Sequence, residues 1–199
     1  MNRIVRYGML LAALAFVAPL ATAQSAGAKS KSKAGTESSF KVGYMDVGPT
    51  VGLGGTGGGI GIGGRFERGF KALPDLNNGV LGIEASVDTW SYSQSYLTAS
   101  ASLRYISVGV TANYHFQIDG SPKVDPFVGL GLGNSSVSSK AKVGGIDYDF
   151  GANASSGIYF IGRAGIRYFY KPRLALYADA GAGARYLNAG VMFGLGGGK

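Results

Sequence analysis

Eight ionisable residues occur as four local pairs along the chain. The two members of each pair differ in position by an even number, which is the spacing of residues on one face of a β-strand. They are Arg65, Glu67, Glu84, Asp88, Arg163, Arg167, Asp179 and Arg185. Arginine and carboxylate groups form ion pairs with two hydrogen bonds, and charges held away from bulk water are tolerated when they are paired. These four cations and four anions predict an internal, charge-balanced network of salt bridges and hydrogen bonds that fills the lumen. The functional alternative for the same residues is a gated ion path or a proton relay.

The remaining polar residues offer little for catalysis or metal binding. His115 is the only histidine and cysteine is absent, so no nucleophile with a neighbouring base can be identified and a metal site lacks ligands. His115 shares a strand face with Ser107 and Asn113, and we interpret it as an internal hydrogen-bonding group. No catalytic residue, no cofactor and no metal site is predicted.

The run that contains His115 indicates how these side chains are positioned. From Ile106 to Phe116 apolar residues alternate with polar or small ones, which is a period of two. The second face of this run and of the others carries charge, hydroxyl groups and many of the 35 glycines, too densely for an ordinary protein core. Apolar side chains facing outward and polar ones facing inward are typical of a barrel in lipid, in which small inward glycines leave room for arginine and tyrosine.

Turn-forming residues separate eight expected strands, an even number that suits a closed antiparallel meander. The expected ranges are 40–53, 59–70, 79–92, 100–118, 124–137, 157–170, 173–186 and 187–196. The two longer connections, 93–99 and 138–156, fall on one side of the meander, and this is the outer side if the mature chain starts in the periplasm. The second connection is either a surface-contact loop or a solvated hairpin tip. Its candidate residues are Lys140, Lys142, Asp147, Tyr148, Asp149 and Phe150.

The amino terminus has the features of a secretory signal peptide. Arg3 and Arg6 precede an apolar stretch and a small-residue site, which predicts cleavage after Ala23. The expected organisation is a signal peptide over 1–23, a flexible polar leader over 24–39, the barrel over 40–196 and a tail over 197–199. Much of the net charge of +8 lies in the leader and no basic patch is visible on a folded face, so no nucleic-acid partner is predicted.

A spacing in the last expected strand resembles the signal that barrel-insertion machinery reads, and it is formed by Asn188, Gly190, Phe193 and Leu195. Together with the sequences at 126–131 and 63–67, it makes the chain from about 40 to 195 resemble the small outer-membrane β-barrel proteins of Gram-negative bacteria, the OmpA-like and OmpX-like transmembrane barrels. The resemblance implies an all-β fold, an eight-stranded antiparallel up-and-down transmembrane β-barrel. It also implies membrane lipid, lipopolysaccharide and the insertion machinery as partners.

These patterns favour a structural or surface-interaction barrel of the outer membrane, without catalytic activity and with an unknown surface ligand. One alternative is a narrow channel for small ions or solutes. Another is a lipid A-modifying enzyme, but lipid A deacylases carry a His-x-Ser pair facing lipid, whereas this chain has His115-Phe116-Gln117 with His115 expected to face inward. A soluble exported barrel for an apolar ligand would require the apolar faces to point inward.

Overall fold

The structure is a computed structural model that describes residues 39–55, 58–97, 99–149 and 155–196. These residues form nine strands and the turns between them. The strands are β1 (Met45–Leu53), β2 (Ile60–Leu73), β3 (Gly79–Tyr96), β4 (Ala99–His115), β5 (Val124–Val143), β6 (Ile146–Asp149), β7 (Ser155–Lys171), β8 (Leu174–Ala182) and β9 (Leu187–Gly196). The predicted signal peptide, nearly all of the predicted leader and the predicted tail lie outside the described residues.

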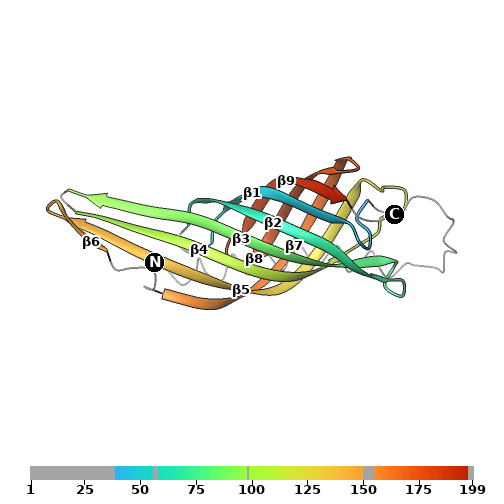
Figure 1. Cartoon of the computed structure of the whole chain (residues 1–199), viewed down its shortest axis with the longest axis horizontal. Coiled ribbons are helices and arrows are strands. Elements are labelled where there is room, and N and C mark those ends of the chain that lie inside the picture. The colour runs from blue at the N-terminus through green and yellow to red at the C-terminus, as the bar shows by residue number, and fades with distance from the viewer. Residues whose placement is uncertain (1–38, 56–57, 98, 150–154, 197–199) are drawn as a thin grey trace, which may run out of the picture. The chain divides into compact units, whose positions relative to one another are not determined.

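The strands pair in a closed ring. Each strand is antiparallel to its neighbours in the order β4-β3-β2-β1-β9-β8-β7-β5, and β4 pairs with β5 to complete the circuit (Figure 1). The short strand β6 pairs only with the far end of β5. The predicted all-β, eight-stranded antiparallel up-and-down barrel is therefore confirmed. Among the described residues, no helix has the length and apolar character required to cross a membrane.

Alternation along each strand decides which side chains line the lumen. On β4, Val108 and Val110 point outward and are 52% and 58% exposed, whereas Thr111 and Asn113, which follow them on the opposite face, are fully buried. Leu130 on β5 likewise points outward and is 64% exposed. The outer wall of the barrel is thus apolar and the interior is polar.

Inward glycines create the room that larger lumen side chains occupy. A methyl group at Gly133 would overlap the Tyr159 ring, and one at Gly165 would overlap the Phe127 ring. Each pair combines a glycine with an aromatic residue on the neighbouring strand, because β5 and β7 are paired along this stretch. The predicted small-against-large packing is present at these positions.

The expected long loops at 93–99 and 138–156 are wrong for most of their length. β3 and β4 continue pairing through Ser93 and Ser102 to their shared tip, and β5 continues to Val143 before it turns back into β6. The β5–β6 turn contains Gly144 and Gly145, which both have positive φ and so match a two-residue type I′ hairpin. In Figure 1, β3, β4, β5 and β6 continue together beyond the end of β1 and β2. We call this four-stranded part the extension.

The first expected strand also begins too early, because β1 starts at Met45 and not at residue 40. The chain before it turns at Gly43, which has a φ of 81° and donates a backbone hydrogen bond to Gly69. This turn directs Phe40 into the barrel, where its side chain is fully buried. A polar leader followed directly by a strand therefore does not describe this end of the chain.

Three further strand boundaries differ from the expected ones. The expected strand 100–118 ends at His115, because the next residue in register on β5 is Pro126, which accepts a backbone hydrogen bond from Phe116 but has no N–H to donate in return. The expected strand 173–186 ends at Ala182, because a tight turn closed between Gly181 and Tyr186 leads into β9. The expected strand 59–70 instead reaches Leu73 on β2.

Candidate functional site

The eight charged residues predicted to share an inner face all come from inward positions of β2, β3, β7 and β8 and from the turn before β9. Their side chains are almost completely removed from solvent: relative exposures run from 0% for Glu67, Glu84 and Arg167 to 6% for Asp179, and the side chain of Arg163 is 6% exposed. These residues occupy the lumen together with further polar groups. They divide into a central group, a lower group at the end of the barrel where β1 begins, and a single residue, Arg185, at the opposite, upper end.

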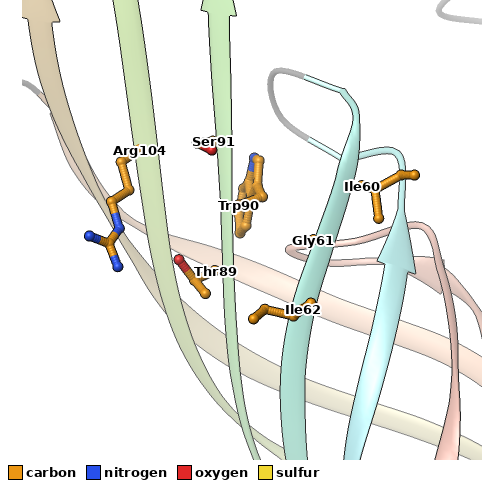
Figure 2. Close-up of a pocket in the computed structure, with 7 residues that line it drawn as sticks. All are labelled: Ile60, Gly61, Ile62, Thr89, Trp90, Ser91 and Arg104. Carbon is orange, nitrogen blue, oxygen red and sulfur yellow. The ribbon is translucent and has the colours of Figure 1, made fainter.

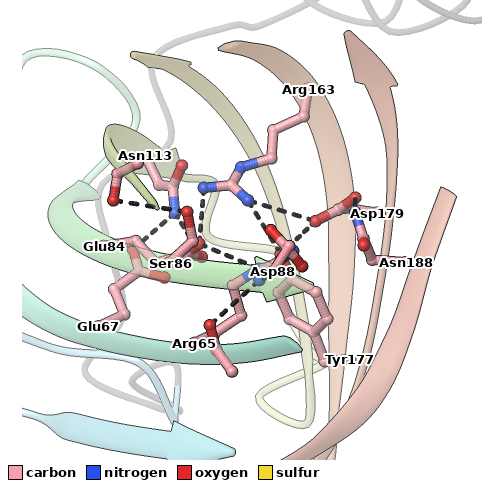
Figure 3. A network of polar contacts seen from close by, with 12 residues as sticks. Arg65, Glu67, Glu84, Ser86, Asp88, Asn113, Arg163, Tyr177, Asp179 and Asn188 are labelled. Atoms are coloured by element: carbon pink, nitrogen blue, oxygen red, sulfur yellow. Dashed lines mark hydrogen bonds and ion pairs between the residues drawn. The ribbon is translucent and has the colours of Figure 1, made fainter. Parts of the chain in front are cut away.

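The central group is organised around Glu84 and Arg163. Nη2 of Arg163 lies 2.6 Å from Oε1 of Glu84, and its Nη1 lies 3.4 Å from Oδ2 of Asp179. Arg65 lies beside them, with its Nη1 3.0 Å from Oδ1 of Asp88 and its Nε 3.6 Å from Glu84. Figure 3 shows Arg163 reaching from β7 across the lumen toward Glu84 on β3. The charged groups of opposite walls thus bind one another through the centre of the barrel.

Neutral side chains complete the hydrogen bonding of this central group (Figure 3). The amide of Asn113 donates to Glu67 at 3.0 Å and to Glu84 at 3.3 Å. Asn188 donates to Oδ1 of Asp179 at 2.7 Å, and the Tyr177 hydroxyl donates to Oδ2 of the same carboxylate. Glu84 and Asp179 therefore each accept more than one hydrogen bond, which compensates for the burial of their charge.

The lower group surrounds His115, at the end of the barrel where β1 begins. Nε2 of His115 lies 2.8 Å from Glu67, and Nδ1 lies 2.9 Å from Asp125. Arg167 contacts the other oxygen of Glu67 and lies 3.5 Å from Asp46. An imidazole held between two carboxylates, with a guanidinium alongside, forms a continuous polar chain across this end of the lumen.

Aromatic side chains cover the lower group from below. Phe40 stacks on the His115 ring with 3.7 Å between ring centroids, and the Arg167 guanidinium lies 4.9 Å from the centre of the Phe40 ring. Ser39, next to Phe40, donates both backbone and side-chain hydrogen bonds to the Pro122 carbonyl. Phe40 also belongs to an apolar cluster that covers this end of the lumen, with Tyr44, Val80, Phe127, Phe169, Ala175, Tyr177 and Met192. The segment before β1 thus closes this end of the barrel.

Arg185 differs from the other predicted network members. Within the described residues it forms no ion pair: its Nη1 donates to the carbonyls of Gly54, Gly58 and Gly59, at 2.5, 3.4 and 3.4 Å. Its guanidinium also lies 4.4 Å from the centre of the Trp90 ring, which stacks on Tyr105. Arg185 therefore joins the lumen side chains through hydrogen bonds and a cation–π contact, because it reaches the upper turn instead of the centre of the lumen.

Sequence reasoning placed His115 inside the barrel but missed its two carboxylate contacts, and it missed two charged members of the lower group, Asp46 and Asp125. Asp46 and Asp125 are fully buried, so six carboxylates face four arginines and one histidine among the described lumen residues. The signal was available for Asp125, which lies two residues before the inward Phe127. Asp46 was obscured because Phe40, Val42 and Tyr44 share its parity in the expected strand 40–53, so this face has an apolar appearance in the sequence.

The remaining space in the central lumen is small. A cavity of about 20 Å³ lies beside Arg65, Asp88, Arg163, Asp179 and Asn188. A single water molecule needs about 10–15 Å³ by this kind of measure. Within the described ranges, no group of three or more histidine, cysteine or carboxylate side chains is arranged to hold a metal ion. The described interior is suited to ion pairing and hydrogen bonding.

The residues of the expected insertion signal lie on β9. Phe193 and Leu195 point outward and are 49% and 56% exposed, whereas Asn188 is buried against Asp179. Gly190 packs against the Pro49 carbonyl of β1.

Of the candidate contact residues in the extension, Lys142 lies 3.7 Å from Asp147. Tyr148 is exposed, and Phe150 lies outside the described residues.

Comparison with known proteins finds similarity in solved structures alone. No protein-family model matches the chain, and no curated protein matches it. The attachment invasion locus protein Ail of Yersinia pestis matches at 15% identity over 77% of this chain and 96% of its own, with a TM-score of 0.44. The N-terminal β-barrel domain of Pseudomonas aeruginosa OprF matches at 15% identity over 77% and 96%, with a TM-score of 0.43. Neisserial surface protein A matches at 18% identity over 76% and 91%, with a TM-score of 0.37.

The comparison of folds depends on the strand pairings of this chain. Every strand of the ring pairs with its sequence neighbours, and the first strand, β1, pairs with the last, β9. At the level of fold, the resemblance to the small outer-membrane barrels of Gram-negative bacteria is confirmed, since these strands close into an eight-stranded antiparallel ring.

Proposed function

We propose that this chain is an outer-membrane barrel that acts as a structural and surface-interaction protein. The observation that carries the proposal is the opposite polarity of the two sides of its wall. Val110 and Leu130 are more than half exposed on the outside, whereas Glu84 and Arg167 are fully buried inside. An apolar exterior has no favourable contact with water but matches the hydrocarbon of a bilayer.

Membrane integration is tested by fractionation of expressing cells and by gel migration before and after heating. An integrated barrel sediments with outer membranes, resists alkaline extraction and migrates differently once boiled. Recovery of the chain in the soluble periplasm would contradict the proposal. The same fractions, analysed by mass spectrometry of the amino terminus, test the proposed cleavage after Ala23.

The interior supports a structural role over conduction. Arg163 bridges Glu84 and Asp179 across the centre of the lumen, and Phe40 closes the lower end. We expect planar-bilayer recordings of the purified chain to show no conductance steps above background. The charged lining is the feature that favours the alternative, a narrow channel for small ions, and reproducible ion-selective steps would support that alternative.

Surface interaction is assigned to the extension. It continues beyond the ring, and its tips carry the exposed apolar side chains Leu97, Val143 and Ile146. Removal of residues 140–149 takes away the four β4–β5 pairings at the tip. It leaves the β4–β5 pairings from Leu103 with Ser139 to His115 with Phe127, and the β5–β7 pairings, in place. We expect bacteria that express this shortened chain to adhere less to an epithelial monolayer than bacteria that express the full chain. Equal adhesion, with both chains heat-modifiable, would contradict this assignment.

We further propose that the chain has no catalytic activity. His115 is the one histidine of the sequence, and its two nitrogens contact carboxylates of the buried lower group. A lipid A-modifying enzyme would alter the mass of lipid A in expressing cells. An unchanged lipid A spectrum, relative to cells with empty vector, is the expected result.

The last strand is proposed to carry the signal for the insertion machinery. Phe193 and Leu195 present their side chains on the outer wall, where another protein can contact them. We expect Phe193→Ala to slow appearance of the heat-modifiable form in cells. Phe160→Ala on β7, another outward phenylalanine, is the matched control and should leave the rate close to that of the wild type.

A further inference from the structure

The outer face of the barrel changes polarity abruptly where the extension begins. On β4 the outward side chains are apolar from Val110 to Ile106, and the next outward residue is Arg104. The same face continues as hydroxyl groups and cations across three paired strands. These residues are Ser91, Ser93 and Ser95 on β3, Ser100 and Ser102 on β4, and Ser138, Lys140 and Lys142 on β5.

A hollow of about 390 Å³ lies at this boundary, where β2 ends while β3 and β4 continue (Figure 2). Its lower part is formed by Ile60 and Ile62, which are 67% and 64% exposed. Its polar lining includes Thr89, Ser91 and Arg104. The hollow therefore combines an apolar surface with hydrogen-bond donors and a cation.

The charge of Arg104 is available to a ligand. Among the described residues its guanidinium has no carboxylate partner, whereas Lys142 higher on the same face lies 3.7 Å from Asp147. Ser91 is the cross-strand neighbour of Arg104, so its hydroxyl lies on the same face at the same level. A guanidinium presents several donors in one plane, which suits the oxygens of a phosphate group.

We propose that this hollow binds the phosphorylated headgroup of a membrane lipid. The phosphate accepts hydrogen bonds from Arg104 and Ser91, and an acyl chain of the same molecule lies along Ile60 and Ile62. The inference deepens the proposed function and rests on it, because the outer wall must face lipid. A soluble phosphate would use the cation but would leave the apolar part of the hollow uncovered, so the adjoining apolar wall favours a lipid as the occupant.

The test compares lipid retention by the full chain reconstituted in nanodiscs of a galactolipid, whose headgroup contains no phosphate. The probes are phosphorylated lipid A and the same lipid after enzymatic removal of its phosphates, and native mass spectrometry counts the molecules retained. The wild type is expected to prefer the phosphorylated form by about tenfold, the effect of one charge-assisted hydrogen-bonding group. Arg104→Gln should abolish this preference.

Arg68→Gln is the matched control. Arg68, on β2, is exposed as Arg104 is. It lies toward the opposite end of the barrel, where it pairs with Met45 and Ile83. It should retain the preference of the wild type. An Arg104→Gln chain that still prefers phosphorylated lipid, or an Arg68→Gln chain that loses the preference equally, overturns the assignment of the site.

Two further outcomes separate the possible failures. If inorganic phosphate at millimolar concentration removes the preference, the site binds free anions and the lipid assignment is wrong. If the chain inserts and is heat-modifiable but retains both lipids equally, this inference fails while the proposed function stands. A chain that does not insert at all contradicts the proposed function, and this inference with it.

Discussion

Phe40 lies face to face with His115, with 3.7 Å between the ring centroids and 16° between the ring planes. The two residues are 75 positions apart in the sequence, and the contact joins the segment before β1 to the end of β4. It places an apolar ring directly against the ion-paired lower group. Phe40 is therefore the point at which the amino-terminal segment is fixed to the barrel interior.

Replacement of Phe40 by alanine should destabilise the barrel by about 3–5 kcal/mol, the usual cost of removing a fully buried phenylalanine. Urea unfolding of the chain in lipid vesicles, followed by the fluorescence of the single tryptophan, measures this loss. Val42→Ala, an exposed position in the same segment, should cost little. Similar losses for the two variants would show that the segment is not anchored by Phe40.

The ion pair between Arg167 and Glu67 offers a second test. Arg167→Met leaves Asp46 buried without its cation and Glu67 with His115 alone, and we expect a loss of about 3–5 kcal/mol. Adding Glu67→Gln should recover part of this loss, because the uncompensated anion is removed. A double-mutant cycle measures the coupling, expected to be about 0.5–3 kcal/mol. Strictly additive effects would contradict direct pairing.

Inward glycines should differ in how they tolerate a side chain. Gly133→Leu places atoms in the Tyr159 ring, so the combination with Tyr159→Ala should restore the heat-modifiable form. Gly131→Leu meets the backbone of Val110 and Thr111, which cannot move away, and no such rescue is expected. Gly157→Ala, where the added atom meets nothing within 4 Å, is the control. Rescue of both leucine variants by Tyr159→Ala would contradict the packing described.

A cation on the outer wall should be tolerated according to its level. Val110→Arg places a cation midway along the apolar part of β4, the surface that the proposed function assigns to lipid, and we expect a cost of about 2–4 kcal/mol in vesicles. Ser138→Arg lies on the same outer face but in the extension, next to Arg104, and its cost should be about 0–1 kcal/mol. The free energy of unfolding in vesicles is the measurement. Equal costs at the two positions would be incompatible with a lipid boundary between them.

Much of the barrel could be predicted from local pattern. The period of two along Ile106–Phe116 assigns Val108 to one face and Asn113 to the other, whatever the strand pairs with, because successive side chains of a strand alternate. Turn residues such as Asn78, which has a φ of 55°, mark where one strand ends. Boundaries failed where polar strands continued pairing, since serine-rich hairpins such as Ser93–Ser102 resemble loops in composition.

The sequence by itself determined which residues face inward, and therefore that charge fills the lumen and apolar side chains cover the outside. Only the tertiary structure decided which charges meet. Arg163 finds Glu84, 79 residues away, while Arg185 reaches backbone carbonyls and Trp90 instead of a carboxylate. Partners across a lumen depend on the stagger of all eight strands around the closed ring. That stagger is a property of the whole ring, so no single strand encodes it, and the burial of Phe40 beneath His115 depends on it in the same way.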